Sequence, residues 1–117
     1  MGKLEHYRQT VIELLEKDAA VQPANPDLTL ELLCDTQRDH YAVIVFGRQQ
    51  GRFLYSGVIH IDIIDEKIWI QNNNSELEIS KELTEMGVDP QDIIIGFHPP
   101  EIREAIAQAQ AQCPSMD

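Results

Sequence analysis

His60 and Asp62 stand two positions apart in the isoleucine-rich segment VIHIDII. A histidine beside a carboxylate can act as a general acid or base, with the carboxylate orienting the imidazole. Histidine is also the commonest metal ligand. The next segment, KIWIQNN, places Trp69 and Gln71 at the same spacing. What these four residues do depends on how the two segments are arranged in space.

The two segments are expected to form an antiparallel hairpin around a two-residue turn at 65–66. In that register Asp62 faces Trp69 and His60 faces Gln71. Because side chains alternate between the faces of a sheet, the isoleucines share one face, which must be core. The polar and aromatic side chains share the other face, and a slip of one residue would expose the isoleucines.

Two interpretations of this polar face differ in function. As a catalytic or ligand-binding site, it would use His60 as acid or base and Asp62 as its orienting partner. A His-x-Asp pair without a nucleophile or a third metal ligand is, however, a weak signature of catalysis. Trp is enriched at protein-binding hot spots, so we expect a protein interface and no catalytic, cofactor-binding or metal-binding residues. The candidate interface residues are His60, Asp62, Trp69, Gln71, His98 and Arg103.

His98 and Arg103 come from the segment GFHPPEIR. Gly96 and the two prolines are expected to form a corner before a last helix, with Gly96 permitting the bend. The simplest role of His98 is to cap that helix or to pack near its start. Arg103 lies one turn into the helix, where its guanidinium can pair with a carboxylate of this chain or of a partner.

The elements that position these residues follow from periodicity. Apolar residues at helical spacing predict an amphipathic helix from Lys3 to Ala20. Apolar segments separated by turn residues then predict strands at 28–34, 40–47, 52–64 and 67–73. In the long third strand, Gly57 is expected to mark a bulge or bend.

The remainder of the chain is predicted to be mainly helical. Ser75 and Glu78 form a capping-box pattern that predicts a helix over 75–87. An Asp-Pro pair at 89–90 predicts another N-cap, before a short IIIGF segment that can form a brief strand. The final helix is expected over 99–112. The fold class is therefore α+β, with an N-terminal helix, a four-stranded antiparallel meander sheet and C-terminal helices.

The length and charge of the chain limit the number of domains and the kinds of partner that it can have. The 117 residues suit a single domain, 1–117. Twenty Asp and Glu against nine Lys and Arg give a net charge of −11, which phosphate backbones repel, so no direct non-specific DNA binding is expected. Two unclustered cysteines indicate a reducing compartment. No apolar segment approaches the ~20 residues that span a bilayer, and the N-terminus lacks a signal core, so we expect a cytoplasmic protein without membrane contact.

Four segments together resemble the XisI family, the fdxN element excision controlling factor proteins of cyanobacteria. They are KLEHYRQ, DTQRDHY, YSGVIHIDIIDEKIWIQNN and EISKELTEMGVDPQDIIIGFHPPEIR, and they cover nearly the whole chain. The sequence departs from the family pattern at the hairpin turn, which is usually Asp-Gly and here is Asp65-Glu66. It also has Gly47-Arg48 where the family often has Gly-Trp.

The resemblance implies an accessory role. XisI-type proteins act with XisH-type proteins to control excision of a DNA element, while a separate recombinase performs strand exchange. We therefore expect a non-enzymatic controlling factor that needs no cofactor, binds an XisH-like protein and forms a homo-oligomer, as a dimer. The alternative is a small enzyme or ligand-binding protein that uses the sheet face of His60 and Asp62.

Overall fold

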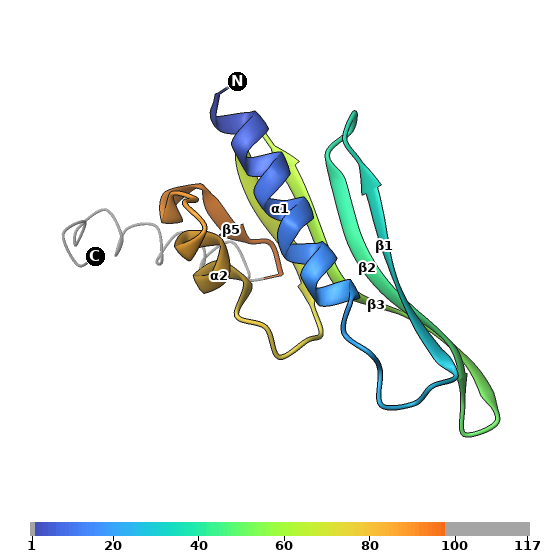
Figure 1. Ribbon diagram of the computed structural model, residues 1–117. Helices are drawn as coiled ribbons and strands as arrows, with labels where there is room; N and C mark the ends of the chain where they lie inside the picture. Colours follow the sequence, from blue (N-terminus) through green and yellow to red (C-terminus); the bar gives the residue numbers. More distant parts are fainter. Residues whose placement is uncertain (1, 98–117) are drawn as a thin grey trace.

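The computed structural model describes residues 2–97, in which helices cover one face of a five-stranded sheet (Figure 1). The sheet order follows the chain, β1-β2-β3-β4-β5. The elements are α1 (Lys3–Ala19), β1 (Leu28–Asp35), β2 (His40–Gln49), β3 (Arg52–Ile64), β4 (Lys67–Asn73), α2 (Ile79–Glu85), η1 (Pro90–Asp92) and β5 (Ile93–Ile95). No helix within this part of the chain is long and apolar enough to cross a membrane.

The sheet is mixed, which corrects the expected four-stranded antiparallel meander. β1 to β4 pair antiparallel as predicted, but β5 adds a fifth strand parallel to β4. Its three isoleucines pair with Ile68, Trp69 and Ile70. A parallel neighbour requires a crossover connection, and α2 with η1 supplies it. The expected final helix over 99–112 lies outside the described residues.

The second helix begins later than the capping-box pattern predicts. Ser75 Oγ accepts from the amide of Leu77 at 3.2 Å and donates to Asn73 Oδ1 at 2.6 Å, so it stabilises a turn and α2 starts at Ile79. The capping-box prediction was therefore wrong. The helix end was predicted correctly: Gly87 has a φ of 102°, and the amide of Val88 donates to the carbonyl of Leu83.

The core lies between the helices and one face of the sheet. The apolar stripe of α1 and the inner side of α2 pack on alternate residues of the central strands. The buried apolar residues are Tyr7, Val11, Leu14, Leu15, Tyr41, Val43, Ile59, Ile61, Ile63, Ile68, Ile70, Ile79, Leu83 and Val88. The isoleucines of VIHIDII and KIWIQNN that face the core are among them, as the alternation predicts.

Two features of the sheet matter for function. Its second face, here called the outer face, is covered by no element of the described chain. In addition, the hairpin formed by β2 and β3 extends past the last turn of α1 (Figure 1). This projecting part, residues 45–56, is here called the arm. A two-residue turn at its tip places Gln50 and Gly51 at positive φ.

Candidate protein-binding site

Asp62 is the centre of a polar cluster on the outer face. Its side chain is almost fully buried, and the residue is only 8% exposed. His40 Nδ1 and His60 Nε2 each donate to Asp62 Oδ1 at 2.9 Å. Gln71 Nε2 donates to Asp62 Oδ2 at 3.3 Å. Three strands, β2, β3 and β4, therefore contribute to one hydrogen-bonded group.

Burial raises the pKa of Asp62, but the hydrogen bonds from His40 and His60 outweigh it, and the pKa is lowered overall. The carboxylate therefore stays ionised at neutral pH. Because a carboxylate only accepts hydrogen bonds, the imidazole nitrogens that face it must carry protons. In a neutral imidazole the opposite nitrogen is an acceptor, so each ring offers one further hydrogen-bonding group.

The register of the β3–β4 hairpin agrees with the prediction except at one pair. Asp62 pairs with Trp69, as expected, and Ile61 pairs with Ile70. His60 pairs with Asn72 and not with Gln71, because an irregularity follows at this point in β4. Gln71 is thus left out of the regular pairing, yet its side chain still reaches Asp62.

Gly96 holds Gln71 in place from the neighbouring strand edge. A Cβ on Gly96 would collide with the side-chain amide of Gln71, and the amide of Gly96 donates to the carbonyl of Ile70 at 2.8 Å. The φ of Gly96 is not positive. The glycine therefore leaves space beside Gln71, and it lies in a turn directly after β5.

Trp69 pairs with Asp62 across strands β3 and β4, and its side chain is half-buried. The structure thus brings together His60, Asp62 and Gln71 by hydrogen bonds and places Trp69 beside them. We call His40, His60, Asp62, Trp69 and Gln71 the polar patch. The other two candidates, His98 and Arg103, lie outside the described residues.

His40 is a member of the cluster that sequence reasoning missed. Counting back from the arm turn, where Gln49 pairs with Arg52, would place His40 opposite Ile61 and on the core side. A bulge between Val43 and Ile44 shifts the register by one residue and places His40 opposite Asp62. Gly57 was the signal for that bulge, but its position alone does not give the direction of the shift.

A hollow of about 240 Å³ adjoins the two imidazoles on this side of the sheet. Its lining is Leu33, Cys34, Asp35, His40, Tyr41, Ala42 and His60. Burial raises the pKa of the Cys34 thiol, and Glu16 raises it further, which is opposite to what a nucleophilic cysteine needs. Within residues 2–97, no group of three or more His, Cys, Asp and Glu side chains is arranged to hold a metal ion.

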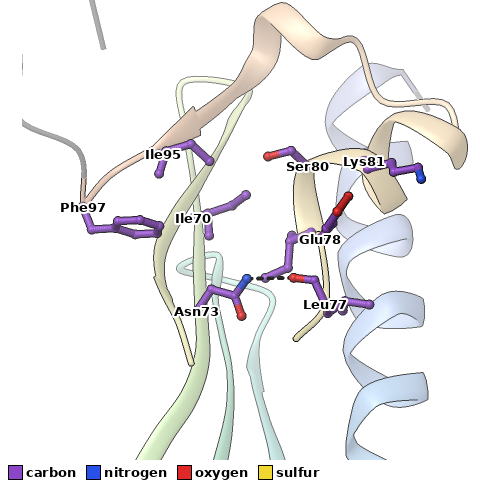
Figure 2. A pocket seen from close by; sticks show the side chains of 9 residues that line it. Ile70, Asn73, Leu77, Glu78, Ser80, Lys81, Ile95 and Phe97 are labelled. Carbon is purple, nitrogen blue, oxygen red and sulfur yellow. Dashed lines mark hydrogen bonds between the residues drawn. The ribbon is translucent and has the colours of Figure 1, made fainter. Parts of the chain in front are cut away.

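A second hollow, of about 340 Å³, lies between α2 and the β4–β5 edge (Figure 2). Ile70, Ile95 and Phe97 form its apolar side, and Asn73 Nδ2 donates to the carbonyl of Leu77 at 2.9 Å across it. Glu78 and Lys81 are the charged residues in its lining. It does not include the polar patch.

Two further carboxylates, the half-buried Asp39 and the buried Asp92, have structural roles. Asp39 accepts from Arg8 Nε at 2.7 Å and from the Tyr41 hydroxyl at 2.8 Å, which ties the β1–β2 turn to α1. Asp92 accepts from the Tyr7 hydroxyl at 2.6 Å. Burial and this bond to Asp92 raise the pKa of Tyr7 to about 12. Much of the KLEHYRQ, DTQRDHY and GVDPQDI pattern therefore stabilises the fold, whereas the polar patch faces outward.

Two solved structures resemble this chain over most of its length. A crystal structure of a XisI-like protein from Anabaena variabilis has a TM-score of 0.83 and 36% identity, over 89% of this chain and 95% of that one. A crystal structure of the fdxN element excision controlling factor XisI from Anabaena variabilis has a TM-score of 0.77 and 32% identity, with the same coverage of both chains. No protein of curated function matches the sequence.

The two structures define the class as XisI-like α+β proteins. The family model for XisI protein matches residues 1–109. The chain therefore belongs to the XisI family, as the resemblance of its four segments indicated.

Proposed function

We propose that this chain is a non-enzymatic controlling factor in the excision of a DNA element, and that it acts by binding an XisH-like protein. The family and the description of one structural neighbour as an excision controlling factor support the general role. The observation that supports a contact-based mechanism is the polar patch. It is an ordered hydrogen-bonded group on a sheet face that no described element covers.

The chemistry of the polar patch favours recognition over catalysis. Asp62 accepts hydrogen bonds from His40, His60 and Gln71, which keep its carboxylate ionised and fixed in place. A fully hydrogen-bonded network holds its members in one arrangement. Such preorganisation lowers the entropic cost of binding a partner.

The charge of the chain indicates what kind of partner surface fits. With a net charge of −11, the protein attracts a basic surface at long range. At the polar patch, the imidazole nitrogens that face away from Asp62 can form further hydrogen bonds, and the half-buried indole of Trp69 offers apolar area. A partner that presents Lys or Arg beside an apolar side chain would match both.

Replacing Trp69 with Ala tests this proposal. If Trp69 is a hot spot, its loss should weaken the complex with an XisH-like protein by at least about tenfold, which corresponds to about 1.4 kcal/mol. Isothermal titration calorimetry gives the affinity, and thermal unfolding reports on the fold. Val21→Ala is the matched control, because Val21 is 60% exposed in the loop after α1. Unchanged affinity of a folded Trp69→Ala protein would discard the polar patch as the interface.

A second candidate function is binding or conversion of a small molecule, which the hollow beside His40 and His60 favours. In that case a ligand should perturb the NMR resonances of both imidazoles, and Asp62→Asn should abolish the effect. If compounds found in a ligand screen leave both resonances unchanged, this candidate is discarded.

A further inference from the structure

Two imidazoles of the polar patch share one carboxylate oxygen. His40 Nδ1 and His60 Nε2 both donate to Asp62 Oδ1, each at 2.9 Å. The carboxylate is almost fully buried and has a lowered pKa, whereas the two histidine side chains are 57% and 47% exposed. The patch therefore combines an ionised centre that is fixed in place with two titratable rings that are open to solvent.

The bonds to Asp62 determine which nitrogen carries the proton in each neutral ring. A carboxylate only accepts hydrogen bonds, so the nitrogen that faces it must carry a hydrogen. His40 is then in the Nδ1–H form and His60 is in the Nε2–H form. The opposite nitrogens, His40 Nε2 and His60 Nδ1, are acceptors in these forms, and neither has a hydrogen-bond partner within residues 2–97.

Protonation of the rings changes this surface without breaking the cluster. An imidazolium donates from both of its nitrogens. The nitrogen that faces Asp62 therefore keeps its hydrogen and its bond, while the nitrogen that faces away changes from acceptor to donor. The charge changes as well. Asp62 with two neutral rings carries one negative charge, and Asp62 with two protonated rings gives one positive charge.

The elements around the two rings supply no second carboxylate that bonds to them. In the described chain, the titratable groups nearby are Asp62 of β3, Asp39 of the β1–β2 turn, and Glu31, Cys34 and Asp35 of β1. The carboxylate of Asp35 pairs with Arg38 at 3.4 Å, and that of Asp39 pairs with Arg8 at 2.7 Å. The neighbours on β4, Trp69 and Gln71, carry no charge. The charge of the patch therefore depends on Asp62 and the two rings.

The change falls in a pH range that a cell can reach. Histidine is the side chain whose charge ordinarily changes between about pH 5 and 8. The two rings bond to the same oxygen, so they titrate as a pair. As the pH falls through this range, the patch changes from a negative surface with two acceptors to a positive surface with only donors.

We propose that the polar patch is a proton-sensitive contact, which binds the XisH-like protein when His40 and His60 are neutral and releases it when they are protonated. This inference rests on the proposed function and adds what regulates the contact. The net charge of −11 favours a basic partner surface, whose Lys or Arg N–H groups can donate to neutral rings. Protonated rings cannot accept these hydrogen bonds and repel the same charges.

NMR spectroscopy of the free protein tests the switch without a partner. Long-range ¹H–¹⁵N spectra identify the nitrogen that carries the proton in each imidazole. At about pH 7.5, His40 should be in the Nδ1–H form, the less common form of free histidine, and His60 should be in the Nε2–H form. At about pH 5.5 both rings should carry two protons, with the fold retained.

The affinity for the XisH-like protein tests the consequence. Calorimetry should show at least about tenfold weaker binding at pH ~5.5 than at pH ~7.5, because excluding one proton costs up to about tenfold per pH unit. A His40→Asn/His60→Gln protein keeps a donor toward Asp62 and an acceptor away from it, but it cannot be protonated. Its affinity should change by less than about threefold over the same range, which also controls for groups that titrate on the partner.

A matched control comes from the arm, which shares the outer face and contains no His, Asp or Glu. Phe53 is 63% exposed there, and Phe53→Ala should keep the pH dependence of the wild-type protein. Thermal unfolding at both pH values shows whether each variant is folded. If the double variant does not fold, the single variants His40→Asn and His60→Gln replace it, and each should lose part of the pH dependence.

Two results would overturn the proposal. The first is a His40 ring in the Nε2–H form, or either ring already doubly protonated, at about pH 7.5. The second is an equal pH dependence of binding for the wild-type protein and the double variant. The absence of a complex at both pH values would refute the proposed function, and with it this regulation. The NMR titration separates these failures, because it shows whether the patch itself changes its charge.

Discussion

At the scale of single residues, three carboxylates with little exposure differ in role: two of them hold the fold together, and one faces outward. Asp39 and Asp92 connect helices to strands, and each receives a tyrosine hydroxyl. Asp62 instead organises two histidines on an uncovered face. Similar residue types therefore serve different purposes, depending on the face of the sheet on which they lie.

Asp92 gives the sharpest prediction at this scale. The residue is 6% exposed and also lies near the amines of Lys3 and Lys67. Asp92→Ala would leave the buried Tyr7 hydroxyl without its acceptor, so the free energy of unfolding should fall by about 2–4 kcal/mol. Urea denaturation measures the change. Glu85→Ala on the exposed side of α2 should change it by less than about 0.5 kcal/mol, and equal effects of the two would refute the role of Asp92.

At the scale of elements, the β3–β4 turn carries backbone strain. Asp65 and Glu66 have φ values of 53° and 62°, the conformation of a two-residue turn that favours Gly at the second position. Glu66→Gly should therefore raise the free energy of unfolding by about 1 kcal/mol. Glu66→Ala removes the same side chain but keeps the strain, so it should give no such gain. Equal midpoints for the two variants in chemical denaturation would contradict this explanation.

Helices and strands that depend only on local sequence signals could be predicted from the sequence. The first helix was expected over Lys3 to Ala20 and ends at Ala19, and all four long strands were located, because periodicity and turn residues are local signals. β5 was expected only as a brief strand, and its parallel pairing was missed because that depends on where α2 directs the chain. The bulge in the β2–β3 pairing depends on tertiary contacts in the same way.

The candidate site was predictable to the same extent. His60, Asp62 and Gln71 follow from alternation along two adjacent strands, so their common face could be predicted. His40 comes from a third strand whose register a bulge shifts by one residue, and no count along the sequence gives that shift. The space that Gly96 leaves for Gln71 likewise appears only once β5 lies beside β4.

At the scale of the whole molecule, the free energy of unfolding should decrease as the pH becomes acidic. Burial acts to raise the pKa values of Asp62 and Asp92, but hydrogen bonds outweigh it and lower both. The bond from Arg8 lowers the pKa of Asp39. In an unfolded chain these groups titrate near pH ~3.9. Their contribution is therefore complete above about pH 4 and is lost as the pH falls through the lower folded values.

Urea denaturation at about pH 7 and pH 3, at ~0.15 M salt to screen the exposed charges, measures this dependence. The protein should be less stable at the lower pH. Asp39→Asn should be less stable at neutral pH but should show a shallower loss on acidification. The same slope in both proteins would exclude Asp39 as a source of the pH dependence.

We propose that the chain controls excision by contact with an XisH-like protein. Co-expression of the two proteins from the same genome, followed by size-exclusion chromatography with light scattering, tests it most directly. The expected result is a stable mixed complex that Trp69→Ala diminishes and Val21→Ala does not. Recovery of this chain alone, at a mass that the XisH-like protein leaves unchanged, would contradict it.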